Sequence, residues 1–206
     1  MEKSLPIRHI PLYRGDRLIS ALKRQGLKNI PTNVVLDKTL PGVGATYTEI
    51  HAKRNSIIIE PNVPVIKGKV AKHEKLNLLG VHVKVTTEMV KRYLLNCNVE
   101  YKKILTTPEG FWKIKKAANG IGLNIYTDFF CLFDECEKLN QDVGYRKKIT
   151  NPVTDFFEFE NKAFVSATPL AIHHPKVYEQ HFQWLKIEPQ FDYKKDIELI
   201  LTGHAG

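Results

Sequence analysis

Long apolar runs are missing from this sequence. No stretch approaches the roughly 20 consecutive apolar residues that a transmembrane helix needs. The first fifteen residues, MEKSLPIRHIPLYRG, also lack the apolar core of a signal peptide. We therefore expect a cytoplasmic protein that makes no membrane contact.

Cysteine is scarce, with three residues among 206: Cys97, Cys131 and Cys136. An odd number without a CxxC pair argues for reduced thiols and against a metal site built on cysteine. Cys131 lies inside an apolar run, where a thiol packs as a small hydrophobic group. We therefore expect free cysteines.

Acidic residues are outnumbered, with 22 Asp and Glu against 31 Lys and Arg, which leaves a net charge of +9. This surplus favours polyanionic partners such as nucleic acid, although a solvated basic surface would produce the same composition. The 206 residues, 43% of them hydrophobic, suffice for one globular domain.

The stretch around which the chain is organised is 129–137, with the sequence FFCLFDECE. Its unbroken apolar run is typical of a short strand buried on both faces of a parallel sheet. Ligands of such sheets bind outside the carboxyl ends of the strands, where Asp134 and Glu135 would lie. There Asp134 would hold a magnesium ion and Glu135 would orient or deprotonate a water. The alternative is that Asp134 caps the next helix and Glu135 lies in its first turn.

Other short apolar segments alternate with amphipathic ones along the chain. We expect strands at 33–36, 55–61, 81–85, 103–105, 129–133 and 163–165, and helices at 16–25, 46–52, 63–79, 87–95, 111–119 and 137–149. Residues 1–15 are expected to be irregular, and 154–160 either extends a helix or forms an edge. The alternation predicts an α/β domain with a mostly parallel sheet and helices on both faces.

A glycine-containing loop, DKTLPGVGAT, follows the first expected strand. Gly42 and Gly44 would allow backbone amides to curl around phosphates, and the helix that follows would direct its N-terminal end at the anion. Thr46 would supply a hydroxyl facing magnesium. The alternative is an ordinary glycine turn between a strand and a helix.

This loop is closest to the helicase phosphate-loop pattern A-x-x-G-x-G-K-T, aligned on Thr39 to Thr46. Ala45 stands where the pattern has the lysine that contacts the β- and γ-phosphates, and Thr39 replaces a small residue. Lys38, just before the loop, would replace part of the missing charge.

Four more motifs follow the loop along the chain: IIIEPNVPVI, ILTTPEG, LFDECEK and FVSATPL. Together with the loop, they resemble the first RecA-like domain of a superfamily 2 helicase of the DEAD/DEAH kind, a P-loop NTPase fold. In that family each motif follows a strand of one sheet. The resemblance covers about residues 33–170.

The resemblance implies ATP and Mg2+ as cofactors. Asp134 would bind magnesium through water, together with Thr46, and Glu135 would be the catalytic base. Ser166 and Thr168 would couple the nucleotide to the nucleic acid, unless Ser166-Ala167-Thr168 is an ordinary strand exit. The residues expected to contact the nucleotide are Lys38, Thr39, Gly42, Gly44, Ala45 and Thr46.

DNA or RNA, bound through a single-stranded backbone, is the partner that the resemblance implies. The nucleic-acid path would follow Pro61, Asn62, Thr107, Pro108, Glu109 and Gly110, flanked by Lys113 and Lys115. Lysines also recur after Asn62, at Lys67, Lys69 and Lys72. The alternative for Thr107-Pro108 is a turn or a helix start.

We expect one helicase-like domain at 1–186, with 1–30 as an N-terminal extension. Residues 187–206 would be a linker or the start of a second RecA-like domain, which in the family supplies arginine fingers. The sequence thus predicts the ATP-binding half of a DNA or RNA helicase or translocase with little activity alone. The alternatives are a catalytically degenerate module that binds nucleic acid or a protein partner, and a purely structural α/β domain.

Overall fold

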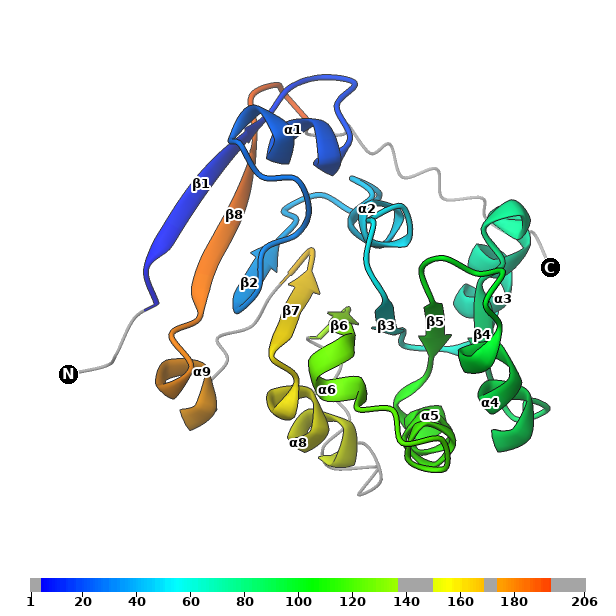
Figure 1. Ribbon diagram of the computed structural model, residues 1–206. Coiled ribbons are helices and arrows are strands. Elements are labelled where there is room, and N and C mark those ends of the chain that lie inside the picture. Colours follow the sequence, from blue (N-terminus) through cyan, green and yellow to red (C-terminus); the bar gives the residue numbers. More distant parts are fainter. Residues whose placement is uncertain (1–4, 137–149, 169–173, 194–206) are drawn as a thin grey trace, which may run out of the picture.

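The computed structural model describes residues 5–136, 150–168 and 174–193. Within these ranges one eight-stranded sheet forms, and every strand pair in it is parallel (Figure 1). From one edge to the other the strands are β1 (Ile7–Leu12), β8 (Gln183–Pro189), β2 (Val34–Asp37), β7 (Asn161–Ser166), β6 (Phe130–Asp134), β3 (Ser56–Ile59), β5 (Lys103–Thr106) and β4 (Leu79–Val81). The predicted α/β class with a parallel sheet is confirmed.

Helices cover both faces of the sheet, as predicted. Alternate residues of each strand point to opposite faces, so Ile57 and Ile59 join one hydrophobic cluster while Ile58 joins the other. The face of Ile58 is covered by α1 (Leu18–Arg24), α2 (Ala45–Ile50) and α3 (Val63–Lys72). The opposite face is covered by α4 (Thr87–Leu95), α5 (Phe111–Asn119), α6 (Ile125–Asp128), α8 (Thr150–Glu158) and α9 (Pro175–Glu179).

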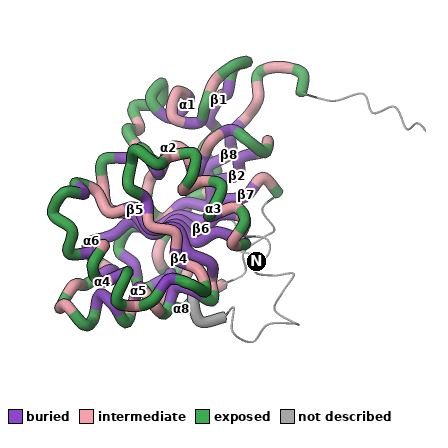
Figure 2. The backbone as a smooth tube through the Cα atoms, turned by 90° about the vertical axis from the view of Figure 1, so that its right-hand side faces the viewer, coloured by how far each residue is buried: buried purple, intermediate pink, exposed green. Residues whose placement is uncertain are grey.

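The central strands are buried along their whole length. Every residue of β3, β5 and β6 is buried, and Figure 2 shows the middle of the sheet as the most continuously buried part of the backbone. Strands covered on both faces need apolar residues at consecutive positions rather than at alternate ones. This requirement explains why short unbroken apolar runs were sufficient to predict these strands.

The N-terminal segment differs from its prediction as an irregular extension. Residues 7–12 form β1, which pairs with β8 from Ile7 opposite Trp184 to Leu12 opposite Pro189. Pro6 and Pro11 hid this strand in the sequence, but a proline is tolerated on an edge strand, which leaves one row of backbone groups unpaired. Residues 1–30 thus contribute β1 and α1 to the sheet domain, and the expected linker at 187 begins inside β8.

The strand expected at 81–85 is also wrong in position, because β4 ends at Val81 and residues 82–85 turn away. Helix α3 ends at Lys72, shorter than expected, and lies close against β4. A Cβ atom on Gly80 would lie 2.9 Å from Ile66 Cγ2, so the glycine lets the strand lie against the helix here. The alternating valines of 81–85 misled the prediction, since Val83 is 90% exposed.

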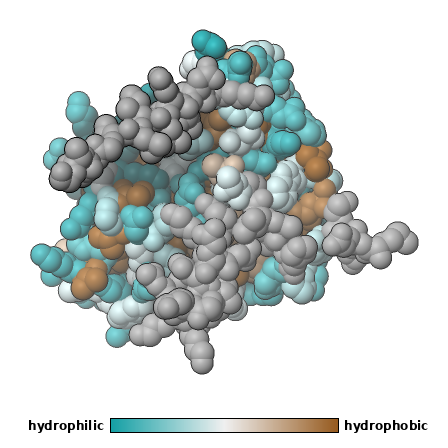
Figure 3. Space-filling model, turned by 180° about the vertical axis from the view of Figure 1, so that it is seen from behind, coloured by the Kyte–Doolittle hydropathy of each residue, from teal (hydrophilic) through white to brown (hydrophobic). Residues whose placement is uncertain are grey.

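The helices expected at 87–95 and 111–119 are found with these bounds, and those expected at 16–25 and 46–52 are found within a few residues as α1 and α2. The hydroxyl of Thr86 caps α4 by accepting a hydrogen bond from Met89 N. The segment 154–160 is mostly helical, within α8, and the helix expected at 137–149 lies outside the described residues. Among the described helices, none is long and apolar enough to span a membrane. The back of the molecule shows small, separated groups of hydrophobic side chains (Figure 3).

Candidate functional site

The motifs found in the sequence meet at one edge of the sheet. Because all the strands are parallel, their carboxyl ends lie together. Backbone hydrogen bonds join these ends, from Lys38 N to Ser166 O at 2.7 Å and from Glu60 N to Thr106 O at 2.8 Å. Asp134 is the last residue of β6, between the two. The structure thus brings the loop, the paired acids and the Ser-Ala-Thr turn into one neighbourhood.

The loop between β2 and α2 is held in an unusual backbone conformation. Gly42 and Gly44 have φ of 80° and 89°, which glycine adopts without strain. Thr39 has φ of 58°, which is rare for a β-branched residue. Its backbone N donates to Asp37 Oδ1 at 2.9 Å, and its hydroxyl donates to Ile187 O at 2.6 Å. Strand β8 therefore helps to fix the loop.

Asp134 is at the centre of the site and is 5% exposed. Thr46 Oγ1 donates to its Oδ2 at 2.6 Å. Lys38 Nζ lies 3.1 Å from its Oδ1 and 2.9 Å from Glu135 Oε1, so this lysine bridges both acids. Burial would raise the pKa of Asp134, but Lys38, Lys69 and the bond from Thr46 hold it below its ordinary value.

A second lysine, which the site prediction missed, reaches the same carboxylate from α3. Lys69 Nζ lies 2.8 Å from Thr46 Oγ1, 2.6 Å from Glu60 Oε1 and 3.5 Å from Asp134 Oδ2. Glu60 is 1% exposed. Burial and the charge of Asp134 raise the pKa of Glu60 to about 7, although Lys69 opposes them. The available signal was an acid at a strand end followed by a helix rich in lysine.

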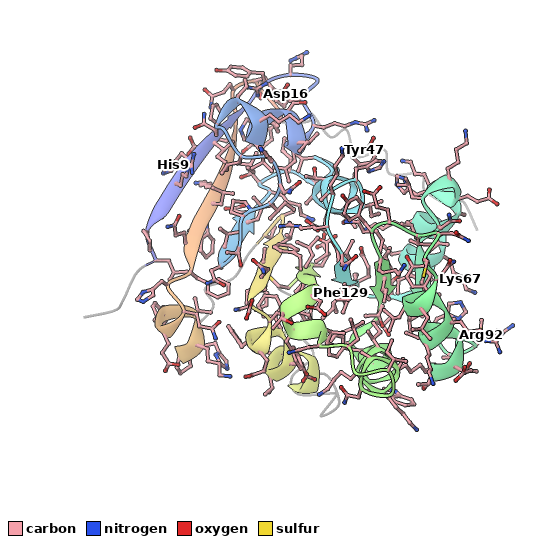
Figure 4. All side chains as sticks on the ribbon, in the orientation of Figure 1. His9, Asp16, Tyr47, Lys67, Arg92 and Phe129 are labelled. Atoms are coloured by element: carbon pink, nitrogen blue, oxygen red, sulfur yellow. The ribbon has the colours of Figure 1, made fainter. Side chains whose placement is uncertain are left out.

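We refer to Lys38, Thr46, Glu60, Lys69, Asp134 and Glu135 as the carboxyl-edge cluster. A cavity of about 340 Å3 opens beside it, and its lining includes all of these residues except Glu60, together with Gly42, Gly44, Ala45, Tyr47 and His73. Figure 4 shows Tyr47 at α2. Its ring stacks on His51 at 4.0 Å between centroids, with Arg17 Cζ 4.5 Å from the ring centre.

The position of Ala45 and the short helix α2 give the phosphate-loop prediction little support. Ala45 is 3% exposed and belongs to the hydrophobic cluster that α1, α2 and α3 cover. Helix α2 has six residues and no side-chain cap at its N-terminus. The charge available to an anion in this cavity therefore comes from lysine side chains.

The residues predicted for nucleic acid are only partly brought together. Asn62 caps α3 by accepting a hydrogen bond from Val65 N at 3.1 Å, and Pro108–Gly110 form a 3-10 turn. Lys113 Nζ donates to His82 O at 2.9 Å and to Val85 O at 2.7 Å. Lys115 instead pairs with Asp155 of α8 at 2.6 Å. The two lysines therefore point to different sides of α5 and do not flank one track.

Ser166 and Thr168 lie close to each other in the turn after β7. Thr168 N donates to Ser166 Oγ at 2.9 Å, and Ser166 is fully buried. Such a bond between a serine hydroxyl and a nearby backbone N–H is a common turn motif. It serves the turn whether or not the turn also couples two ligands.

The predicted magnesium ligands do not fit the ion as the structure arranges them. Thr46 Oγ1 and Asp134 Oδ2 are bonded to each other, and Lys69 Nζ contacts both. Mg2+ binds about six oxygen atoms at roughly 2.0–2.1 Å, several of them usually from waters and substrate phosphates, so each protein ligand must have an oxygen lone pair free for it. In the part of the chain that the structure describes, no group of three or more His, Cys, Asp or Glu side chains is placed to hold a metal ion.

No family model matches the sequence, and no curated protein matches it. Among solved structures, the chain is similar to the crystal structure of the Pyrococcus furiosus Hef helicase domain, with a TM-score of 0.45 and 14% sequence identity. The similarity covers 79% of this chain and 36% of that one, so this chain spans about a third of its length. Similarity at this level identifies no function, which has to be inferred from the site.

Proposed function

We propose that this chain is a nucleotide-binding, helicase-like domain, the ATP-binding half of a DNA or RNA helicase or translocase. The observation that carries the proposal is the convergence of two lysine ammonium groups on Asp134, beside a glycine loop and an open cavity. In this proposal Lys38 and Lys69 supply the positive charge that Ala45 does not.

Lys38 is suited to contact a phosphate. Its side chain is 7% exposed, yet it lines the cavity. Burial would lower the pKa of Lys38, but the charges of Asp134 and Glu135 raise it above the ordinary value, so the ammonium group stays charged. A phosphate oxygen entering the cavity would accept a charge-assisted hydrogen bond from it.

A calorimetric titration with ATP tests this proposal. Replacing Lys38 by Met should weaken ATP binding about 10- to 100-fold, because a charge-assisted hydrogen bond is lost. Lys75→Met is the control, since Lys75 is exposed, comes just after α3 and is not among the residues that line this cavity. Absence of ATP binding in the unmodified protein would favour an ordinary glycine turn instead.

The catalytically degenerate alternative is favoured by two observations. Ala45 stands at the lysine position of the loop, and Glu135 is ion-paired with Lys38 at 2.9 Å, which weakens it as a base. We therefore expect the 206-residue chain to hydrolyse ATP very slowly or not at all in a phosphate-release assay. Vigorous turnover that disappears in Glu135→Gln would instead establish an active enzyme.

A single-stranded nucleic acid remains the proposed polyanionic partner, at a site that differs from the one first expected. The pKa of His82 is lowered by burial and then by the charges of Lys67, Lys113 and Lys84, and Lys113 Nζ donates to His82 O at 2.9 Å. Oligonucleotide anisotropy at low salt tests this basic patch. Charge reversal at Lys67 and Lys84 should weaken binding more than the same reversal at Lys23 and Lys28, which are exposed near α1. Equal losses would leave only general basicity.

A further inference from the structure

The structure holds an ammonium group where the helicase resemblance predicts a divalent metal ion. The expected metal ligands are Thr46 and Asp134. Lys69 Nζ lies 2.8 Å from Thr46 Oγ1 and 3.5 Å from Asp134 Oδ2. The other oxygen of Asp134 is bonded to Lys38, at 3.1 Å from its Nζ. Both carboxylate oxygens of Asp134 therefore already face a lysine.

Lys69 is also tied to this position from the outside. Its Nζ lies 2.6 Å from Glu60 Oε1, on a carboxylate that is 1% exposed. Three oxygens from α2, β6 and the segment after β3 thus surround one ammonium group, which has three N–H donors to share among them. Removing Lys69 from this place would leave the buried Glu60 without its cation.

A magnesium ion would have to displace this arrangement. To bind Thr46 Oγ1 at the short distance that Mg2+ requires, with Asp134 bound through a water, it would lie close to the ammonium group of Lys69, which is 2.8 Å from the same hydroxyl. Like charges so close in a buried site repel each other strongly. Lys69 would have to leave Glu60 before the ion could enter.

We infer that Lys69 is the resident cation of this site and that a nucleoside triphosphate binds to it without a divalent metal. The side chain of Lys69 is 26% exposed and lines the cavity, so its ammonium group can share a hydrogen bond with a phosphate oxygen while it stays bonded to Glu60. This inference rests on the proposed nucleotide-binding function, but it does not require hydrolysis.

The first experiment is a calorimetric titration of the full chain with ATP, in EDTA and in excess Mg2+. We expect ATP affinities that agree within about threefold. Binding only in Mg2+ would overturn the inference and leave the proposed function intact. Binding in neither condition would remove the proposed function itself.

The second part of this titration uses variants in which Lys69 is replaced. Lys69→Met should weaken ATP binding in EDTA about 10- to 100-fold, with partial recovery when Mg2+ is added. Lys69→Arg should retain most of the binding in EDTA. Lys75→Met, just beyond the end of α3, is the control and should change nothing. Unchanged binding by Lys69→Met in EDTA would overturn the inference.

Metal binding without nucleotide supplies an independent measurement. Mn2+ binding is followed by electron paramagnetic resonance. We expect no Mn2+ site that depends on Asp134 in the unmodified protein, so Asp134→Asn should leave its Mn2+ titration unchanged. Lys69→Met should acquire such binding. If Lys69→Met fails to fold by circular dichroism, the double variant Lys69→Met with Glu60→Gln removes the buried unpaired charge and takes its place. Mn2+ bound to the unmodified protein and lost in Asp134→Asn would contradict the inference.

Discussion

Two clusters of buried charge lie at opposite ends of the same strands. The carboxyl-edge cluster surrounds Asp134. At the other end lies a group that we call the amino-edge cluster, made of Glu49, Arg54, Ser56 and Lys103. Glu49 is fully buried, and its Oε1 accepts hydrogen bonds from Ser56 Oγ at 2.5 Å and from Arg54 Nε at 2.9 Å. Each cluster combines carboxylates, one in the amino-edge cluster and three in the carboxyl-edge cluster, with two basic side chains and one hydroxyl.

The two clusters differ in the acceptors to which their lysine and arginine side chains donate hydrogen bonds. In the amino-edge cluster Lys103 Nζ donates to Glu49 O at 2.7 Å, and Arg54 donates to Ile30 O at 3.0 Å. Among the described residues, the hydrogen bonds of Lys38 Nζ and Lys69 Nζ all end on side-chain oxygens. Backbone carbonyls of packed elements cannot move aside, whereas side-chain oxygens can be exchanged for those of a ligand. The comparison favours a structural role for the amino-edge cluster and agrees with the proposed binding role of the carboxyl-edge cluster.

The largest expected effect is on stability at the amino edge. Glu49→Ala removes the one carboxylate of this cluster and leaves Arg54 and Lys103 without it. We expect the free energy of unfolding to fall by about 3–5 kcal/mol, because buried charges lose their partner. Urea unfolding followed by circular dichroism measures this change.

Glu135→Ala is the matched change at the carboxyl edge. The side chain of Glu135 is 31% exposed, and Lys38 keeps Asp134 as its other partner. We expect a loss below about 1 kcal/mol, as for a partly exposed ion pair. Equal losses from Glu49→Ala and Glu135→Ala would break the distinction between the two clusters.

The next effect depends on pH. Burial lowers the pKa of Lys103 to about 8, opposed by Glu49 and assisted by Arg54. An unfolded lysine titrates near 10.4, so between about pH 8 and 10.4 the unfolded state binds more protons, and stability should rise with pH. Burying the charged Lys103 lowers the free energy of unfolding in full below about pH 8, and this cost disappears as Lys103 deprotonates at higher pH.

This dependence can be isolated by subtraction. The difference in free energy of unfolding between the unmodified protein and Lys103→Met should shift by up to about 3 kcal/mol in favour of the unmodified protein from pH 7 to 10.5. Burial raises the pKa of Tyr93 to about 12, which has the opposite sign at high pH, but this residue is present in both proteins. A difference that does not vary with pH would show that Lys103 is charged in both states.

The smallest effect compares the two hydroxyl groups. Ser56 Oγ links Glu49 to Lys103 Nζ, at 2.5 and 2.9 Å, and Thr46 Oγ1 links Asp134 to Lys69 Nζ, at 2.6 and 2.8 Å. Ser56→Ala should cost about 1–3 kcal/mol, because buried partners are left unsatisfied. Thr46→Val should cost less than about 1 kcal/mol, because water from the cavity can replace the hydroxyl. Thermal unfolding of the two variants under the same conditions measures the difference, and a larger loss for Thr46→Val would reverse it.

Parts of the fold were predictable from short stretches of sequence. The unbroken apolar residues of β3 and β6 indicate strands that are buried on both faces, and Thr86 indicates the start of α4. Strand β1 was missed because its backbone pairs only with β8, more than 170 residues away, and its own sequence contains a proline. Pairing between such distant segments leaves no local pattern.

Some residues of the candidate site were also predictable from the sequence, and others were not. By itself the sequence determined that Asp134, Thr46 and Lys38 follow strands or the loop after a strand, and parallel strands place such residues at one edge. Only the tertiary structure decided that Lys69 reaches Asp134 and that Lys113 and Lys115 point apart. The position of a strand end follows from local residue types, but the direction of a lysine on a helix depends on how that helix packs against the sheet. In this protein that packing determines which cation lies beside the central carboxylate.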